Sequence, residues 1–135
     1  MTAIGLTFGL GISAVSAEVI VVVSSKSPAT TLSRNQVLDI FLGKRTRLPD
    51  GSSVVPIDQN EGAAARGEFY VRFAGMSPAQ VKAFWAKIIF TGRGQPPIAV
   101  ATSLEVKKLL LANPNAIGYI DQTMMDSTLR VVLAP

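Results

Sequence analysis

The stretch that decides the fold is EVIVVVS, which runs from Glu18 to Ser24. Its five consecutive β-branched aliphatic residues, 19–23, are typical of a strand that is buried on both faces of an α/β sheet. The run ends at Ser25-Lys26-Ser27-Pro28, because proline cannot continue a central hydrogen-bonded ladder. The sequence therefore predicts a central strand over residues 18–24.

Helix signals follow this strand. Ser33 and Gln36 form a capping-box pattern, and Gly43 supplies a stop about ten residues later. Ser77-Pro78 opens another helix, with serine as N-cap and proline at the first position. That helix carries an apolar stripe at i, i+3, i+4 and i+7, formed by Val81, Phe84, Trp85 and Ile88. Further helices are expected near 63–74 and over 103–112, the latter facing inward through Val106, Leu109 and Leu110.

Short apolar runs predict the remaining strands, at 54–57, 98–101, 116–120 and 129–133. The resulting order, β-α-β-α-α-β-α-β-β, is typical of the α/β class with a mixed, mostly parallel sheet flanked by helices. No repeat, low-complexity tract or internal linker interrupts it. We therefore expect one domain over residues 18–135.

Composition limits the chemistry that the chain can perform. The 135 residues contain no Cys and no His, which excludes disulfides, zinc fingers, cysteine nucleophiles, Ser-His triads and a haem-ligating histidine. The remaining resources are carboxylates, Lys and Arg, hydroxyls and backbone dipoles. A net charge of +4 suits anionic solutes, envelope surfaces or acidic proteins. We therefore expect a binding protein and not an enzyme, with no cofactor and no metal.

Residues 1–17 carry no charged side chain and end in Val15-Ser16-Ala17, a small-residue pattern that signal peptidase accepts. They predict a secretory leader and hence a periplasmic or secreted domain that does not meet nucleic acid. The alternatives are a buried first helix or strand, or a membrane anchor. Glycines at 5, 9 and 11 weaken a helix, and the apolar run is shorter than the ~20 residues of a membrane span.

The best candidate site is the junction between the strand at 54–57 and the following helix, which runs from Asp58 to Arg66. Free N–H groups and the positive end of a helix dipole make such a junction an anion site, and small side chains let an oxyanion approach the backbone. Arg66 could add a guanidinium. The alternative is an ordinary helix start capped by Asn60 or Glu61, with Arg66 solvated.

Other candidates carry weaker signals. Arg93 lies between two glycines in the loop 91–97, which presents its guanidinium or is a plain turn. The basic run at 44–47 forms a patch or a solvated surface. Asp58 with Glu61 could form an acid/base pair, and Asp121 with Asp126 could bind a cation, although neither pair has a recognised spacing.

The segments at 32–44, 54–69 and 113–120 together resemble the phosphate-type periplasmic solute-binding proteins of ABC transporters. The segment LSRNQVLDIFLGK, 32–44, is similar to the family's L-[ST]-R-x-Q-[LV]-x-x-I-F-x-G-K. The segment 54–69 is similar to the part that carries the phosphate-binding helix start, and NPNAIGYI, 113–120, resembles T-P-G-A-I-G-Y-V. Order and spacing also agree over about residues 19–121.

The resemblance implies a single lobe of the type 2 periplasmic-binding fold and a phosphate or related oxyanion as ligand. The family's Arg and Gly-Ser-Gly-Thr correspond here to Asp58 and 61–64, so the hydroxyl donors are absent and the backbone remains. We expect the anion to meet the backbone of the helix start, the guanidinium of an arginine and the end of the first strand. The expected ligand residues are Ser24, Ser25, Asn60, Gly62, Ala63, Ala64, Arg66 and Arg93.

Two functions remain open at this stage. The first is non-covalent capture of a phosphate-like anion, linked to an ABC transporter or an envelope sensor. The second is a non-transport envelope scaffold that kept the fold and lost phosphate binding. A lobe without its partner lobe exposes its former cleft face, which could serve protein contacts or a homodimer.

Overall fold

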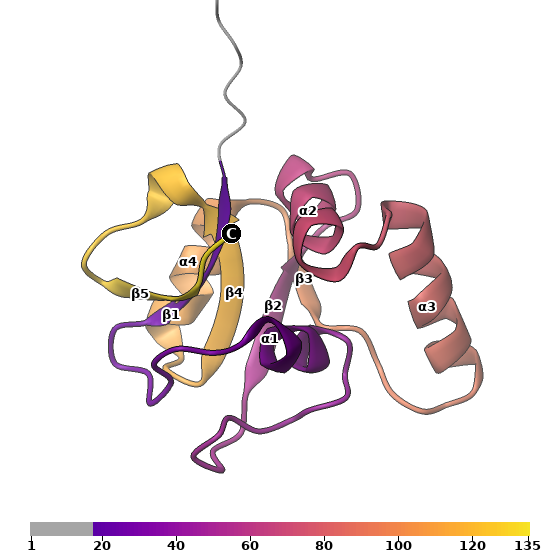
Figure 1. Cartoon of the computed structure of the whole chain (residues 1–135), viewed down its shortest axis with the longest axis horizontal. Helices are drawn as coiled ribbons and strands as arrows, with labels where there is room; N and C mark the ends of the chain where they lie inside the picture. The colour runs from indigo at the N-terminus through magenta and orange to yellow at the C-terminus, as the bar shows by residue number, and fades with distance from the viewer. Residues whose placement is uncertain (1–17) are drawn as a thin grey trace, which may run out of the picture.

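The computed structural model describes residues 18–135, and the secretory leader predicted over 1–17 lies outside the described residues. Its centre is a five-stranded sheet with the order β3-β2-β4-β1-β5 (Figure 1). Strand β2 pairs in parallel with β3 and β4, whereas β1 pairs antiparallel with β4 and β5. Four strands therefore point the same way, and the predicted mixed, mostly parallel sheet is confirmed. The strands are β1 (Val19–Ser24), β2 (Val55–Gln59), β3 (Ile98–Val100), β4 (Ala116–Asp121) and β5 (Leu129–Leu133).

The helices begin where the local sequence signals place them. Ser33 and Ser77 each cap a helix, and each capping box is completed by the glutamine three residues later. The helix expected at 63–74 is α2 followed by a π-helical turn, η1, which ends at Gly75 with φ +64°. None of the described helices is long and apolar enough to cross a membrane. The helical elements are α1 (Arg34–Phe41), α2 (Ala64–Phe69), η1 (Tyr70–Ala74), α3 (Pro78–Phe90), α4 (Ser103–Ala112) and η2 (Gln122–Met124).

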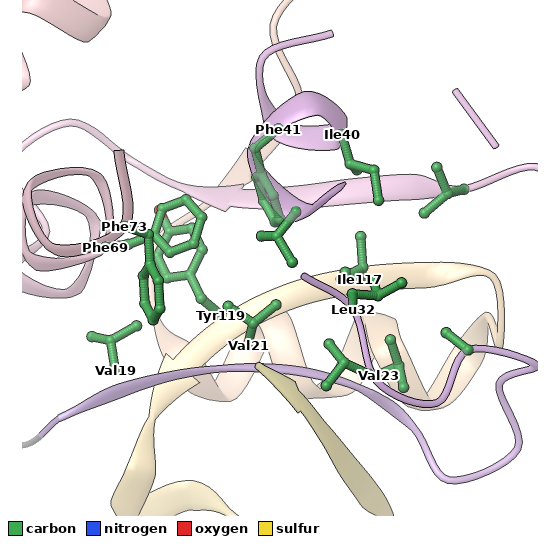
Figure 2. Close-up of a cluster of buried hydrophobic side chains, with 14 of the residues drawn as sticks. Val19, Val21, Val23, Leu32, Ile40, Phe41, Phe69, Phe73, Ile117 and Tyr119 are labelled. Carbon is green, nitrogen blue, oxygen red and sulfur yellow. The ribbon is translucent and has the colours of Figure 1, made fainter. Parts of the chain in front are cut away.

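Strand β1 divides its side chains between two cores, as the predicted strand buried on both faces requires. Val19, Val21 and Val23 point into the larger core, together with aromatic residues of α1, α2 and η1 (Figure 2). Ile20 and Val22 point into a smaller core on the opposite face. The molecule therefore has three layers, with α1, α2 and η1 on one face of the sheet and α4 on the other.

Helix α4 packs closely on β4 in the smaller core. It buries Val106 and Leu110 against the sheet, whereas Leu109, expected to face inward, is partly exposed. The close approach depends on Gly118 of β4, because a Cβ there would lie 2.5 Å from Cγ1 of Val106. A glycine in a central strand thus fixes the distance between a helix and the sheet.

Helix α3 is less firmly attached than the other helices. Of its 13 residues only Val81 and Trp85 are buried, while Phe84 and Ile88 of the predicted stripe are half-buried. Figure 1 shows α3 to the right of the sheet and not over its centre. Its last residue, Phe90, is 92% exposed. The helix therefore leaves room for grooves between itself and the rest of the molecule.

Candidate functional site

Strand β2 continues two residues beyond its predicted end, and this extension creates the polar centre of the site. Asp58 and Gln59, expected in a loop, are both 2% exposed at the end of β2. Burial of a carboxylate and an amide requires that their hydrogen bonds be satisfied. The expectation of a polar loop beginning at Asp58 is therefore wrong, because tertiary partners hold these residues in the sheet.

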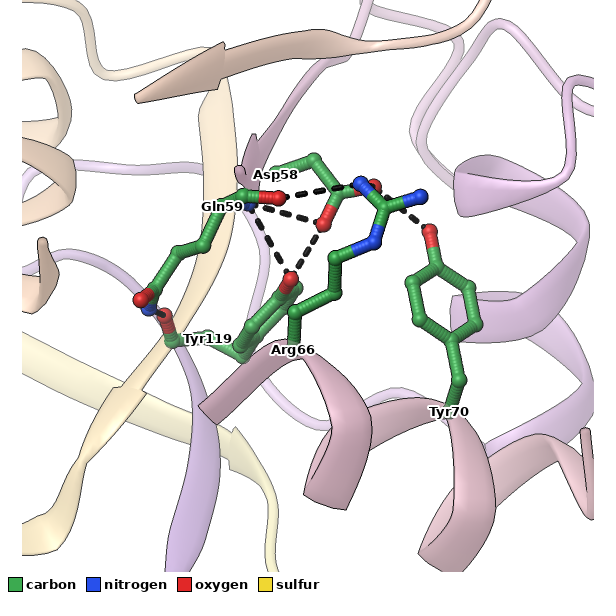
Figure 3. A network of polar contacts seen from close by, with 5 residues as sticks. All are labelled: Asp58, Gln59, Arg66, Tyr70 and Tyr119. Carbon is green, nitrogen blue, oxygen red and sulfur yellow. Dashed lines mark hydrogen bonds and ion pairs between the residues drawn. The ribbon is translucent and has the colours of Figure 1, made fainter. Parts of the chain in front are cut away.

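The carboxylate of Asp58 accepts hydrogen bonds from three sides (Figure 3). The Tyr70 hydroxyl donates to Oδ2 at 2.7 Å, and the Tyr119 hydroxyl donates to Oδ1. The backbone amide of Gln59 also donates to Oδ1, at 2.8 Å. Because these donors come from β2, η1 and β4, Asp58 ties three elements together.

Arg66 completes this network from the first turns of α2. Its Nη1 lies 3.4 Å from Oδ2 of Asp58 and donates to the carbonyl of Gln59 at 2.9 Å. The guanidinium carbon also lies 5.5 Å from the centre of the Tyr70 ring. The alternative of a solvated Arg66 is therefore wrong, since the side chain is 14% exposed and neutralises a buried carboxylate.

The two tyrosines act only as donors toward this carboxylate. Burial raises the pKa of both Tyr70 and Tyr119 above the ordinary value, and the negative charge of Asp58 raises it further. Both hydroxyls consequently keep their protons over the whole physiological range. The hydrogen-bonding capacity of the Asp58 carboxylate is met by donors of the protein itself, none of which belongs to the exposed Glu61.

The start of α2 is open. Its N-cap residue is Ala63, and no side chain caps the helix, so neither Asn60 nor Glu61 satisfies it. A hollow of about 210 Å³ lies beside this start. Because the first amides of a helix have no intrahelical acceptor, they are free to meet a ligand. The hollow is lined by Glu61, Gly62, Ala63, Arg66, Gly67, Tyr70 and Pro78.

A second hollow, of about 370 Å³, lies nearby and shares Arg66 and Glu61 with the first. Asn60 and Lys82 line it, together with Trp85 from α3. Two acidic and two basic side chains border it, so its formal charges cancel: Asp58, Glu61, Arg66 and Lys82. The formal charges of the smaller hollow, Glu61 and Arg66, cancel as well, so charge does not separate the two hollows. The smaller hollow is the better anion candidate because it lies at the uncapped start of α2.

The structure brings only part of the predicted ligand set together. Gly62, Ala63 and Arg66 line one hollow, Asn60 lines the adjacent one, and Ala64 is the first residue of α2. The amide of Ala63 is already bonded to the carbonyl of Asn60 at 3.0 Å. The donors that remain at the helix start are therefore the amides of Ala64 and Ala65, because the amide of Arg66 is bonded to the carbonyl of Ala63 at 3.1 Å.

Ser24 and Ser25 are not brought to this site. Because β1 is antiparallel to β4, with Val19 opposite Asp121, the end of β1 lies where β4 begins. Strand β2 is parallel to β4, so its C-terminal end lies at the opposite end of the sheet from Ser24. Arg93 lines a separate groove that Arg66 does not reach. These three predicted ligands therefore lie outside the hollow.

The second predicted carboxylate pair, Asp121 with Asp126, is engaged in contacts within the described chain. Asp121 accepts from the amide and hydroxyl of Thr123, and Asp126 pairs with Lys107. Within residues 18–135 no group of three or more Asp or Glu side chains is arranged to hold a metal ion.

Sequence reasoning missed Tyr70, Lys82 and Tyr119 as residues around the site, and it included Gln59 in the junction without giving it a role. Tyr119 lies within the AIGYI motif, which drew attention as a family pattern without revealing its hydroxyl's partner. The contact spans 61 positions of the chain, between Tyr119 and Asp58. No local pattern carries such a pairing.

Known proteins match this chain through their solved structures. No family model matches the sequence, and no curated protein matches it. Solved structures do match: an ABC-type phosphate transport receptor from Vibrio cholerae aligns with a TM-score of 0.66 and 17% identity over 86% of this chain. A Clostridium perfringens protein assigned as a phosphate ABC transporter substrate-binding protein, solved with bound phosphate, gives 0.64 and 22% over 86%. PstS from Borrelia burgdorferi gives 0.59 and 16% over 86%.

The alignments cover 45%, 44% and 46% of those three chains, so this chain spans less than half of their length. The matched structures are receptors and substrate-binding proteins. At these identities the likeness concerns the fold, and the resemblance predicted from the three sequence segments is confirmed at that level. The described domain therefore has the α/β fold found in part of the phosphate receptors of ABC transporters.

Proposed function

We propose that this domain binds phosphate or a related oxyanion non-covalently at the open start of α2, in the periplasm or outside the cell, as part of ABC-type transport or sensing. The observation that carries the proposal is the uncapped helix start beside a hollow of about 210 Å³. The likeness of the fold to phosphate receptors supports it.

The helix start offers donors without reactive side chains. The first amides of α2, at Ala64 and Ala65, lie at the positive end of the helix dipole and have no side-chain cap. Gly62 and the alanines around them leave room for an oxyanion to reach the backbone. This arrangement binds anions and provides no nucleophile or general base, so the proposed role is not enzymatic.

Arg66 supports the hollow electrostatically while it serves the internal network. Its Nη1 contacts Asp58 and Gln59, and these two contacts do not use the donors on Nη2 and Nε of the guanidinium. Glu61 lines the same hollow and opposes an anion. We therefore expect an affinity that improves when Glu61 is neutralised.

Calorimetric titration with phosphate and sulfate, against chloride at equal ionic strength, tests the proposal. The decisive variant is Ala64→Pro, because proline at the first helical position removes one amide donor and leaves the helix intact. The preceding residue, Ala63, already has the extended conformation that a following proline requires (φ −69°, ψ 130°).

We expect Ala64→Pro to weaken phosphate binding and Glu61→Gln to strengthen it. Ligand at about 100 times its dissociation constant raises stability by about 2.7 kcal/mol, so the melting temperature gives an independent readout. Unchanged affinity in Ala64→Pro would place the anion elsewhere. Absence of any oxyanion effect would favour the scaffold function instead.

A further inference from the structure

A groove of about 620 Å³ separates α3 from the end of α1 and the start of β2. It is three times as large as the hollow at the start of α2, and Arg66 does not line it. Its size falls within the range of small-molecule sites, about 300–1,000 Å³. Helix α3 contributes Phe84, Trp85 and Ile88, and the loop before β3 contributes Pro96 and Pro97.

The walls of the groove are largely apolar. The rings of Phe84 and Trp85 pack edge to face, with centroids 5.1 Å apart and planes at 86°. Ile40 and Leu42, at the end of α1, also line the groove, as does Ile98 of β3, which is 58% exposed. Displacement of water from such walls by an apolar group is favourable.

Three cations line the groove: Lys44, Arg45 and Arg93. All three are exposed, and none forms an ion pair with a residue of the described chain. No Asp or Glu lines the groove. An apolar body with a negatively charged head therefore matches both the walls and the rim.

Trp85 adds a polar feature to the apolar wall. It is 6% exposed, and its indole Nε1 has no hydrogen-bond acceptor in the part of the chain that the structure describes. A buried donor without an acceptor is costly, and this one is enclosed by the protein, so a ligand acceptor would reach it only if the Trp85 side chain moved. This observation is independent of the charges at the rim.

We propose that this groove binds an amphipathic monocarboxylate, such as a medium-chain fatty acid, with its chain against Phe84, Trp85 and Ile88 and its carboxylate among Lys44, Arg45 and Arg93. Size, apolar walls and unpaired cations favour one such molecule over a protein segment. The site is distinct from the proposed oxyanion hollow and goes beyond that function.

The chain contains one tryptophan, Trp85, so its fluorescence reports on the groove. Titration of the protein with decanoate below its micelle concentration should give a saturable change in emission. Decanol tests the contribution of the charge, and acetate tests that of the chain. We expect decanoate to bind and both comparison ligands to bind at least several-fold more weakly.

Variants separate the two parts of the recognition. Arg93→Gln should raise the dissociation constant of decanoate about two- to fivefold, as expected for one exposed ion pair. Ile98→Asn should weaken binding through the apolar wall, and its partial exposure keeps the cost to folding small. Lys108→Gln removes an exposed charge on α4 and should leave binding unchanged.

The outcomes are distinguishable from those of the oxyanion test. Ala64→Pro should bind decanoate like the unmodified protein, whatever its effect on phosphate. The proposal is overturned if decanoate and decanol bind equally, if the emission does not saturate, or if only an acidic peptide changes the emission. The last result would assign the groove to a protein partner.

Discussion

Asp58 is a charged residue in the interior, and its surroundings resemble those of a bound anion. Two hydroxyls, one backbone amide and one guanidinium surround the carboxylate. From the sequence alone Asp58 was expected at the start of the junction that follows the strand at 54–57, because the groups that surround its carboxylate come from other elements. Its structural role could not be predicted from neighbouring residues.

Tyr119→Phe tests the value of this network. The substitution keeps the ring, which stacks on Phe69 with centroids 4.1 Å apart, and removes one donor to Asp58. A buried carboxylate that loses a donor costs about 1–3 kcal/mol, so the free energy of unfolding in urea should fall by that amount. A loss below about 0.5 kcal/mol would mean that water or the remaining donors replace the hydroxyl.

Asp126 gives a pH-dependent prediction. Hydrogen bonds from Lys107 and Thr128 lower its pKa from 3.8 to about 2. A lowered pKa in the folded state means that the ionised form stabilises the fold above the unfolded value, near pH 4, and that this contribution is lost as the pH falls through about 2.

The stability difference between the protein and Asp126→Asn should therefore be present at pH 6, shrink below pH 4 and be lost as the pH falls below about 2. Urea unfolding at these values measures it. Because Asp126 is exposed, added salt should reduce the difference at pH 6. A difference that is independent of pH would attribute the effect to hydrogen bonding alone.

At the scale of elements, local signals predicted most of the starts and stops. Ser33 and Ser77 cap α1 and α3 as expected, because a capping box involves residues only three positions apart. The end of β2 and the exposure of Leu109 were missed. Both depend on packing between elements, which the pattern within one segment does not contain.

Gly118 shows how one element limits another. Gly118→Ala places a methyl group 2.5 Å from Val106, so β4 or α4 must move, and we expect a loss of about 1–3 kcal/mol. The matched control is Gly67→Ala in α2, where the nearest atom is 4.0 Å away. Removing a helical glycine should stabilise the fold by about 0.5–1 kcal/mol. Equal effects of the two changes in urea unfolding would contradict this account.

Helix α3 should be the least protected helix of the described domain. It buries two residues, and grooves flank it on two sides, whereas α1 buries three of its eight residues. Few buried contacts permit local opening without global unfolding. Native-state hydrogen exchange should show faster exchange of α3 amides than of α1 or β1 amides, and equal protection would rule out a loosely held α3.

At the scale of the whole molecule, the class and the family likeness could be predicted, but the course of the chain could not. The run at 19–23 identified a strand buried on both faces, yet nothing in it sets the direction of that strand within the sheet. Because β1 runs against β2 and β4, Ser24 and Ser25 lie at the opposite end from Asp58. Strand direction is a property of the topology and not of the segment.

The outer position of β3 has a consequence for self-association. This strand forms one margin of the sheet, contains only three residues, and follows Pro96 and Pro97, which have no N–H to donate. A strand of another molecule that paired with β3 would find too few backbone N–H donors to continue the hydrogen-bonded ladder. The shortness of β3 and the two prolines thus disfavour fibril-like growth from this edge of the sheet. The apolar side chains of β3 stay available for contacts that do not use the backbone.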